Sequence, residues 1–272
     1  MQYTYKSLMA LVCLCTFMSA PAIATVDVNV IQQILYFSGS EADIAGSNEG
    51  VPELVGQIAT MAKINDLEKR NRLRGAFVDS FDTSNLKGRV EEELSQKLTK
   101  EEADFLLSWF LSPLGRKISE EETTSHSLEY REERAAFIAK DQSRIDLVTK
   151  AWNAIGMIDY QITSASSQMA LLFDAINTLT PATAQKISSD KIDAIISSQR
   201  SEMRNYVIQS LVNGSVFDYR NLSDEEVKSY EQFFTNEMTV QYYQIYFTVM
   251  ADVSNESISV FVEKLRNFSE IE

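Results

Sequence analysis

The chain has 272 residues, of which 39 are acidic and 25 basic, so its formal net charge is −14. An acidic chain gains nothing from the counterion release that drives non-specific binding to nucleic acid, and anionic membrane surfaces repel it, which argues against both as partners. The length allows one large domain or two domains of ordinary size.

Residues 1–24 predict a secretory signal peptide. A short segment that ends at Lys6 carries one positive charge, and the apolar run that follows to Ala20 is too short to span a bilayer comfortably. Ala22 and Ala24 then supply the small residues of a cleavage site. We expect cleavage after Ala24 and an exported protein with no membrane span; an uncleaved anchor is the alternative.

Hydrophobic residues recur every three or four positions over long stretches, which predicts amphipathic helices. The longest repeat predicts one continuous helix over 145–179. Further repeats predict a helix over 192–211, which Asn213 and Gly214 end, and a last helix over 258–268. No alternating strand pattern accompanies them, so the predicted fold class is all-α, a helical bundle.

Two polar segments predict loops. One covers 38–48 and is rich in Gly, Ser, Asn and Asp, and the other covers 123–127 after an acidic run. Neither is long enough to be a flexible interdomain linker.

One motif occurs twice, with copies 124 positions apart. Each copy starts with a capping box, in which two side chains accept hydrogen bonds from each other's backbone amides, and continues to an aromatic pair. The members are Thr99, Glu102, Trp109 and Phe110, and then Ser223, Glu226, Phe233 and Phe234. We interpret the repeat as an internal duplication, with halves 25–140 and 141–272 that pack as one continuous unit.

A helix-to-helix junction is predicted directly after the first aromatic pair. Ser112 is a good N-cap and Pro113 a favoured first helical residue. Glycine at position 115 lowers helix stability by about 1 kcal/mol relative to alanine. A close approach of another backbone segment at Gly115 would explain why glycine is present. In the second copy Asn236 takes the place of the cap, but Thr239 replaces the glycine and no proline is present. We therefore expect a strict break only in the first copy.

The capping box, the aromatic pair and the step Ser112–Lys117 together resemble the signature of a bacterial secreted family known only as domain of unknown function twenty fifty-nine. Residues 30–44 also resemble the opening helix and turn of that family, and the close match covers residues 60–125. The resemblance implies a helical, exported bacterial protein, here expected in the periplasm. It implies no reaction.

Metal binding and histidine-based catalysis lack the residues that they need. Cys13 and Cys15 leave with the signal peptide, so the mature chain is expected to form no disulfide and no thiolate site. His126 is the single histidine, whereas a zinc site needs three or four N or S ligands. We interpret His126 as a solvated loop residue and expect no cofactor, no metal and no catalytic residue.

Acidic runs at Glu91–Glu93, Glu101–Glu102 and Glu120–Glu122 could supply paired carboxylates to a hydrolase. Adjacent helix residues point about 100° apart, however, so neighbours within a run do not converge. We interpret the runs as solvated helix faces and as N-terminal turns, where acidic side chains suit the helix dipole, and enzyme activity as the less favoured reading.

Aromatic side chains could line an apolar groove between helices, where bundles build ligand sites. The candidates are Trp109, Phe110, Phe233 and Tyr242. Tyr242 belongs to a stripe with Tyr243 and Tyr246, whose hydroxyls need partners or water if they are buried.

Three hypotheses for the function follow. The first is a non-catalytic interaction or scaffold module with an unknown protein partner in the cell envelope, which predicts an exposed apolar patch. The second is a carrier of a small apolar ligand between helices. The third is the hydrolase with paired carboxylates.

Overall fold

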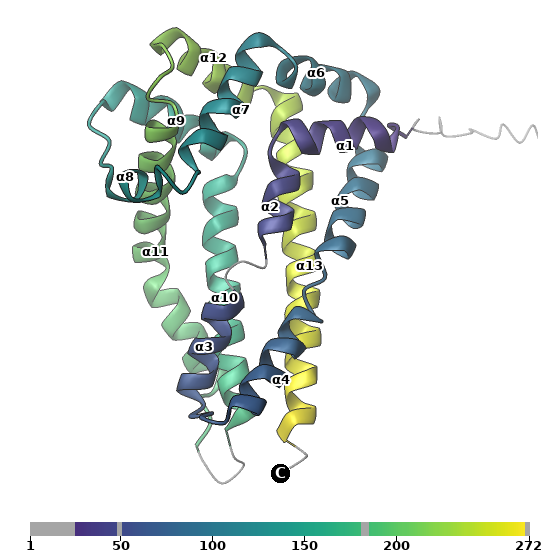
Figure 1. Cartoon of the computed structure of the whole chain (residues 1–272), viewed down its shortest axis with the longest axis vertical. Helices are drawn as coiled ribbons and strands as arrows, with labels where there is room; N and C mark the ends of the chain where they lie inside the picture. The colour runs from purple at the N-terminus through teal and green to yellow at the C-terminus, as the bar shows by residue number, and fades with distance from the viewer. Residues whose placement is uncertain (1–24, 48–50, 181–184, 270–272) are drawn as a thin grey trace, which may run out of the picture.

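The computed structural model describes residues 25–47, 51–180 and 185–269, so the predicted signal peptide lies outside the described residues. Within these ranges every regular element is an α-helix, which confirms the predicted fold class (Figure 1). None of the described helices is both long and apolar enough to cross a bilayer.

The helices of the described residues are, in chain order, α1 (Val28–Phe37), α2 (Ser40–Gly46), α3 (Val51–Met61), α4 (Leu67–Val78), α5 (Thr83–Lys97), α6 (Lys100–Phe110), α7 (Pro113–Ser125), α8 (Arg131–Ala136), α9 (Gln142–Ala154), α10 (Met157–Leu179), α11 (Ser189–Asp218), α12 (Asp224–Phe234) and α13 (Glu237–Ser269).

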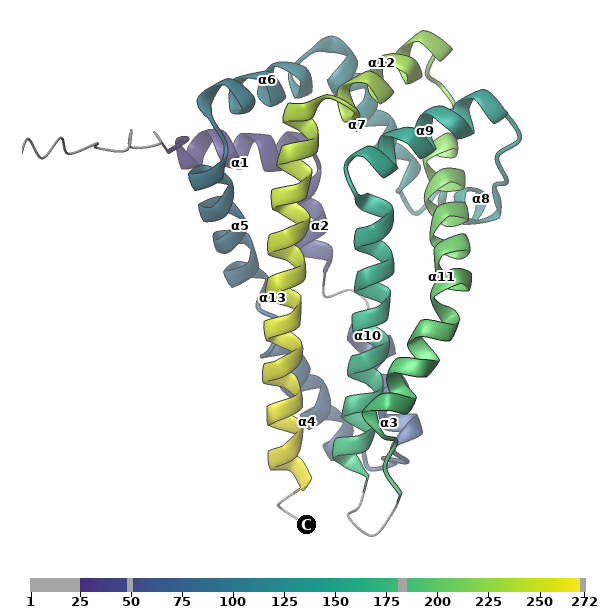
Figure 2. The ribbon, with the colours of Figure 1, turned by 180° about the vertical axis from the view of Figure 1, so that it is seen from behind.

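Short and long helices occupy different parts of the molecule. In Figure 1, α1, α6 and α12 lie across one end, and α10, α11 and α13 run from there along the length of the molecule. The view from behind in Figure 2 shows α10 between α13 and α11, and α10 packs against both. α3 and α4 pack together near the far end, where α3 contacts α10 and α4 contacts α13.

The two halves of the chain share an order of elements and a set of neighbours. α1 leads into α2 through Gly39, and α9 leads into α10 through Gly156; both glycines have φ of 78°, a left-handed conformation that favours glycine. α6 packs on α1 and α12 packs on α9. The helix that follows each aromatic pair also contacts the other half, because α7 contacts α11 and α13 contacts α5. A duplication of the kind predicted would produce this arrangement.

Both predicted capping boxes are confirmed. The Thr99 amide donates to Glu102 Oε2 at 2.7 Å, and the Glu102 amide donates to Thr99 Oγ1 at 3.2 Å. Ser223 and Glu226 make the same pair of bonds at 2.7 and 3.3 Å. Lys117 of the first half also binds Glu226 Oε1 at 2.7 Å, so the second box is tied to the first half.

The chain breaks after both aromatic pairs, so the expectation of a strict break only in the first copy is wrong. Ser112 Oγ accepts from the Gly115 amide at 3.0 Å, and Pro113 starts α7. In the second copy α12 ends at Phe234 and α13 begins at Glu237, while Asn236 Oδ1 accepts from the Met238 amide at 2.9 Å. The asparagine cap suffices without a proline because it satisfies a free amide of the new helix.

Gly115 is where the two helices of the first junction approach most closely. A Cβ added there would lie 2.2 Å from the Trp109 carbonyl oxygen. No side chain fits at that distance, so the first turn of α7 can rest on the last turn of α6 only with glycine at this position.

Several predicted boundaries are wrong. The expected helix over 145–179 is divided into α9 and α10, because Gly156 turns the chain through a left-handed conformation. The helix expected to end at Asn213 and Gly214 continues to Asp218, and the last helix starts at Glu237, long before the predicted 258.

Both predicted loops also contain helix. The segment 38–48 holds α2, and α7 continues through 123–125, with His126 as its C-cap. Both helices carry polar side chains on one side and a buried side chain on the other, which is Ile44 in α2 and Ser125 in α7.

Candidate functional site

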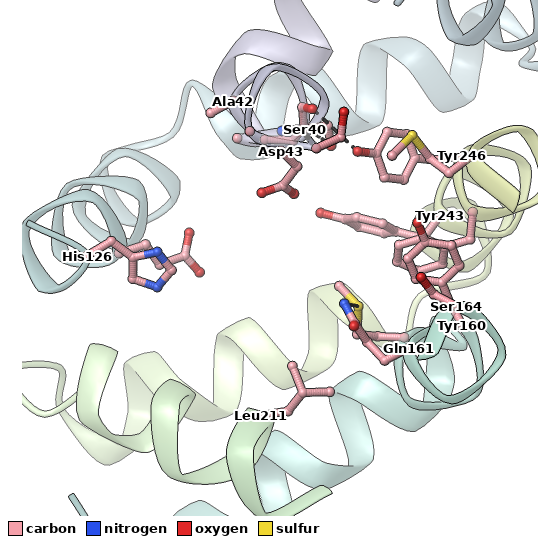
Figure 3. Close-up of a pocket in the computed structure, with 18 of the residues that line it drawn as sticks. Ser40, Ala42, Asp43, His126, Tyr160, Gln161, Ser164, Leu211, Tyr243 and Tyr246 are labelled. Atoms are coloured by element: carbon pink, nitrogen blue, oxygen red, sulfur yellow. Dashed lines mark hydrogen bonds between the residues drawn. The ribbon is translucent and has the colours of Figure 1, made fainter. Parts of the chain in front are cut away.

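A cavity of about 1020 Å³ lies inside the bundle. Figure 3 shows residues of α2, α7, α10, α11 and α13 arranged around one open space. The volume is at the upper end of the range of about 300–1,000 Å³ that is usual for small-molecule sites. Both halves of the chain contribute to the walls.

Aromatic rings form part of these walls. Tyr160 on α10 stacks on Phe247 of α13, with ring centroids 4.6 Å apart and an angle of 16° between the planes. Trp152 lines the cavity as well, and its indole N–H donates to Ser215 Oγ at 2.9 Å. Because these rings are held by stacking or hydrogen bonding, they present fixed faces to a ligand.

The four residues expected to form an apolar groove do not share one surface. Trp109 and Phe110 line the cavity, whereas Phe233 and Tyr242 are buried and do not border it. Phe233 stacks on Trp109 with centroids 4.4 Å apart, so it supports the wall from behind.

Tyr242 belongs to a polar contact between α13 and the start of α2. Its hydroxyl lies 3.1 Å from Ser38 Oγ and 3.0 Å from Ser40 Oγ. Burial raises the pKa of Tyr242 to about 12, so it stays neutral. Tyr242 therefore has a structural role here.

Glu122 faces the cavity from the last turn of α7. The Tyr219 hydroxyl donates to Glu122 Oε1 at 2.6 Å and itself lies 2.6 Å from the Tyr230 hydroxyl. The pKa of Glu122 is raised to about 7: burial is the main cause and the carboxylates of Asp218 and Asp43 add to it, while the hydrogen bond from Tyr219 and the charge of His126 act against it. The interpretation of the acidic runs as solvated faces is therefore wrong for Glu122.

Asp218 at the end of α11 is the best-satisfied carboxylate of the cavity. It accepts from Ser125 Oγ at 2.6 Å and from Arg134 at 2.8 and 2.9 Å, and His126 Nε2 lies 3.4 Å away. Burial would raise the pKa of Asp218, but the donors Arg134, His126 and Ser125 outweigh it and the pKa is lowered. Asp218 is thus ionised and paired.

His126 is solvated, as expected, but it ends a helix and is not a loop residue. It caps α7 and lines the cavity beside Asp218, with 60% of its side chain exposed. Among the residues that the structure places, no group of three or more His, Cys, Asp and Glu side chains could hold a metal ion.

Asp43 on α2 has no such pairing. Figure 3 shows its carboxylate pointing into the open space, and no described residue donates a hydrogen bond to it or forms an ion pair with it. The Asp43 side chain is exposed to water, yet protein atoms surround it on most sides. The resulting loss of hydration raises the pKa of Asp43, partly offset by attraction to His126.

Tyr243 is the second unpaired group. Its side chain is 7% exposed and its hydroxyl points into the cavity (Figure 3), where no described residue hydrogen-bonds to it. Burial raises the pKa of Tyr243 well above its ordinary value, so the hydroxyl stays protonated. The neighbouring Tyr246 differs, because its hydroxyl donates to the Ser40 carbonyl oxygen at 3.3 Å.

Compared with protein-family models, with curated proteins and with solved structures, the chain has no match. The family resemblance seen in the sequence stays a prediction. We therefore infer the function from the geometry of the cavity.

Proposed function

We propose that the chain is an exported binding protein that holds a small molecule in the cavity between its helices. The observation that carries the proposal is Tyr243, whose side chain is 7% exposed and whose hydroxyl is directed into the cavity without a hydrogen-bond partner among the described residues. A polar group of a ligand in the cavity could form the hydrogen bond that no described residue makes with this hydroxyl. The unpaired carboxylate of Asp43 at the same cavity supports the same reading.

The residues that line the cavity favour a different ligand from the small apolar one expected from the sequence. Carboxylates, tyrosine hydroxyls and the amide of Gln161 border the cavity together with aromatic rings. An apolar ligand would leave the polar groups without partners, so a ligand with both a polar group and an apolar body fits better.

The interaction-module hypothesis has less support, because it predicts a contiguous apolar patch. The large apolar side chains that are exposed are spread over several helices and connections; they are Val28, Tyr36, Met61, Leu67, Val78, Leu128, Ile138, Tyr206 and Val260. Single exposed apolar residues are ordinary on a protein surface.

Hydrolysis is the second candidate function, favoured by Glu122 and Asp43, two carboxylates without a basic partner that line one cavity. Glu122, with a pKa of about 7, is poised to donate or accept a proton at neutral pH. If the protein is a hydrolase, Glu122→Gln would abolish turnover and leave ligand binding in place. In a binding protein the wild type and Glu122→Gln would both retain the ligand intact.

Native mass spectrometry of protein purified from the periplasm tests the binding role. We expect the wild type to carry a bound small molecule and Ser164→Phe, which adds a ring to the cavity wall, to lose it. Thr163→Phe is the matched control, because Thr163 neighbours Ser164 on α10 but is exposed outside the cavity. A bound mass that all three proteins carry equally would place the ligand elsewhere and contradict the proposal.

A further inference from the structure

We infer that the ligand is an organic cation, a primary amine with an apolar body. The inference rests on the proposed function and specifies its ligand. It follows from three features of the cavity, which are its charge, its unpaired acceptors and its aromatic faces.

The charge of the cavity is negative. Arg134 is the only lysine or arginine among the lining residues that the structure describes, and its guanidinium is committed to Asp218 by two hydrogen bonds. Asp43 and Glu122 have no such counter-ion, and His126 is the remaining basic side chain nearby. A cation would supply the missing charge, whereas the carboxylates would repel an anion.

The unpaired groups are suited to N–H donors. An ionised carboxylate accepts hydrogen bonds only, and the Tyr243 oxygen can accept one as well. An ammonium group carries three donors, which suits unpaired acceptors such as the Asp43 carboxylate and the Tyr243 oxygen. Charge-assisted bonds of this kind are about twice as strong as neutral ones.

Aromatic faces complete the site. Tyr160 and Phe247 form a stack at the cavity wall, and Tyr243 adds a third ring nearby. A cation held against such faces gains from the ring quadrupoles, and the apolar body of the ligand gains from burial against them. A neutral sugar would also stack on the rings but would leave the charge of Asp43 uncompensated.

Three probes of one shape and different charge test the inference, namely phenethylamine, 2-phenylethanol and 3-phenylpropionate. Both tryptophans of the chain, Trp109 and Trp152, line the cavity, so intrinsic fluorescence reports binding, and calorimetry gives the stoichiometry. We expect the amine to bind at one site, at least tenfold more tightly than the alcohol, and the carboxylate not to bind.

Two variants on α2 locate the charge. Asp43→Asn should weaken amine binding at least tenfold and leave alcohol binding unchanged. Glu41→Gln removes the same charge from the same helix outside the cavity, where Glu41 pairs with Lys87, and should leave amine binding unchanged. Equal losses in the two variants would show that only long-range charge acts, and would contradict a contact with Asp43.

The outcomes separate this inference from the proposed function. If the alcohol or the carboxylate binds as tightly as the amine, and Ser164→Phe abolishes that binding, the cavity is a ligand site and the inferred cation is wrong. If no probe binds in a manner that Ser164→Phe abolishes, and the native protein carries no ligand, both are overturned.

Discussion

Glu122 is a carboxylate whose protonation changes near neutral pH because of where it lies. Its neighbours are the hydroxyls of Tyr219 and Tyr230, the paired carboxylate of Asp218, the imidazole of His126 and the carboxylate of Asp43. Of these, only His126 can offer it a positive charge, while Asp218 and Asp43 oppose its ionisation. Glu122 therefore binds a proton more tightly in the folded chain than in the unfolded chain.

We predict that Glu122→Gln stabilises the protein at pH 8 but not at pH 4.5. The folded pKa of about 7 lies above the ordinary value of 4.5, so between these values the folded state binds more protons and stability falls as pH rises. The variant lacks this loss, and we expect roughly 1–3 kcal/mol of added unfolding free energy at pH 8. Urea titrations at both pH values check this, and a difference independent of pH would refute it.

Asp218 holds α8 onto α11 through Arg134. The guanidinium packs directly against Gly214, where an added Cβ would lie 2.6 Å from Arg134 Nη2. This contact explains why a glycine that reads as a helix stop in the sequence lies inside α11: the space above it is filled by a guanidinium, and the helix continues beneath.

Asp218→Asn should destabilise the protein by roughly 2 kcal/mol, because Arg134 loses its charged partner in a partly buried place. Asp224→Asn is the control, since Asp224 also pairs with an arginine, Arg144, but is 75% exposed. Exposed pairs contribute less than about 1 kcal/mol. Chemical unfolding of the two variants measures the difference, and equal losses would contradict the role given to Asp218.

At the scale of elements, the two junctions use different sequences for one purpose. The first uses serine, proline and glycine, and the second uses asparagine alone, yet each ends one helix and starts another within two residues. The capping boxes were predictable because a cap is a local hydrogen bond that the sequence spells out. The second break was missed because an asparagine cap is a weaker signal than a proline.

Gly115→Ala is predicted to cost roughly 1–3 kcal/mol, because the added methyl group would overlap the Trp109 carbonyl oxygen and force α6 and α7 apart. Gly88→Ala is the matched control: Gly88 lies in α5 with no atom within 4 Å of an added Cβ, so alanine should stabilise by about 0.5–1 kcal/mol. Thermal unfolding compares the two. Effects of the same sign would contradict the close contact at Gly115.

At the scale of the whole molecule, the two halves share a core across their boundary. α13 packs on α5 and α10, so neither half closes a core without the other. One hydrophobic cluster runs from Ile31 in α1 to Val253 in α13 and includes the stacked pair Trp109 and Phe233.

We therefore predict a single unfolding transition. Far-ultraviolet circular dichroism follows all helices, and tryptophan fluorescence follows one residue from each half, so the two signals should change together. Two separated transitions would show that the halves fold independently, and would contradict the shared core.

The site was less predictable than the fold. Helical periodicity and caps are local, so they indicated the fold class and both motifs. Asp43, Glu122 and Tyr243 are far apart in the sequence, and only the packing of α2, α7 and α13 brings them to one cavity. One signal was present: the stripe of Tyr242, Tyr243 and Tyr246 required hydroxyl partners, and Tyr243 is the one that found none in the described chain.

A crystal structure of the protein with phenethylamine tests the central claim most directly. We expect the ammonium nitrogen to lie inside the cavity, within about 2.7–3.2 Å of an Asp43 carboxylate oxygen and of the Tyr243 hydroxyl. The phenyl ring should lie against Tyr160 or Phe247. An empty cavity at a saturating concentration of the amine, or an amine bound only at the outer surface, would contradict it.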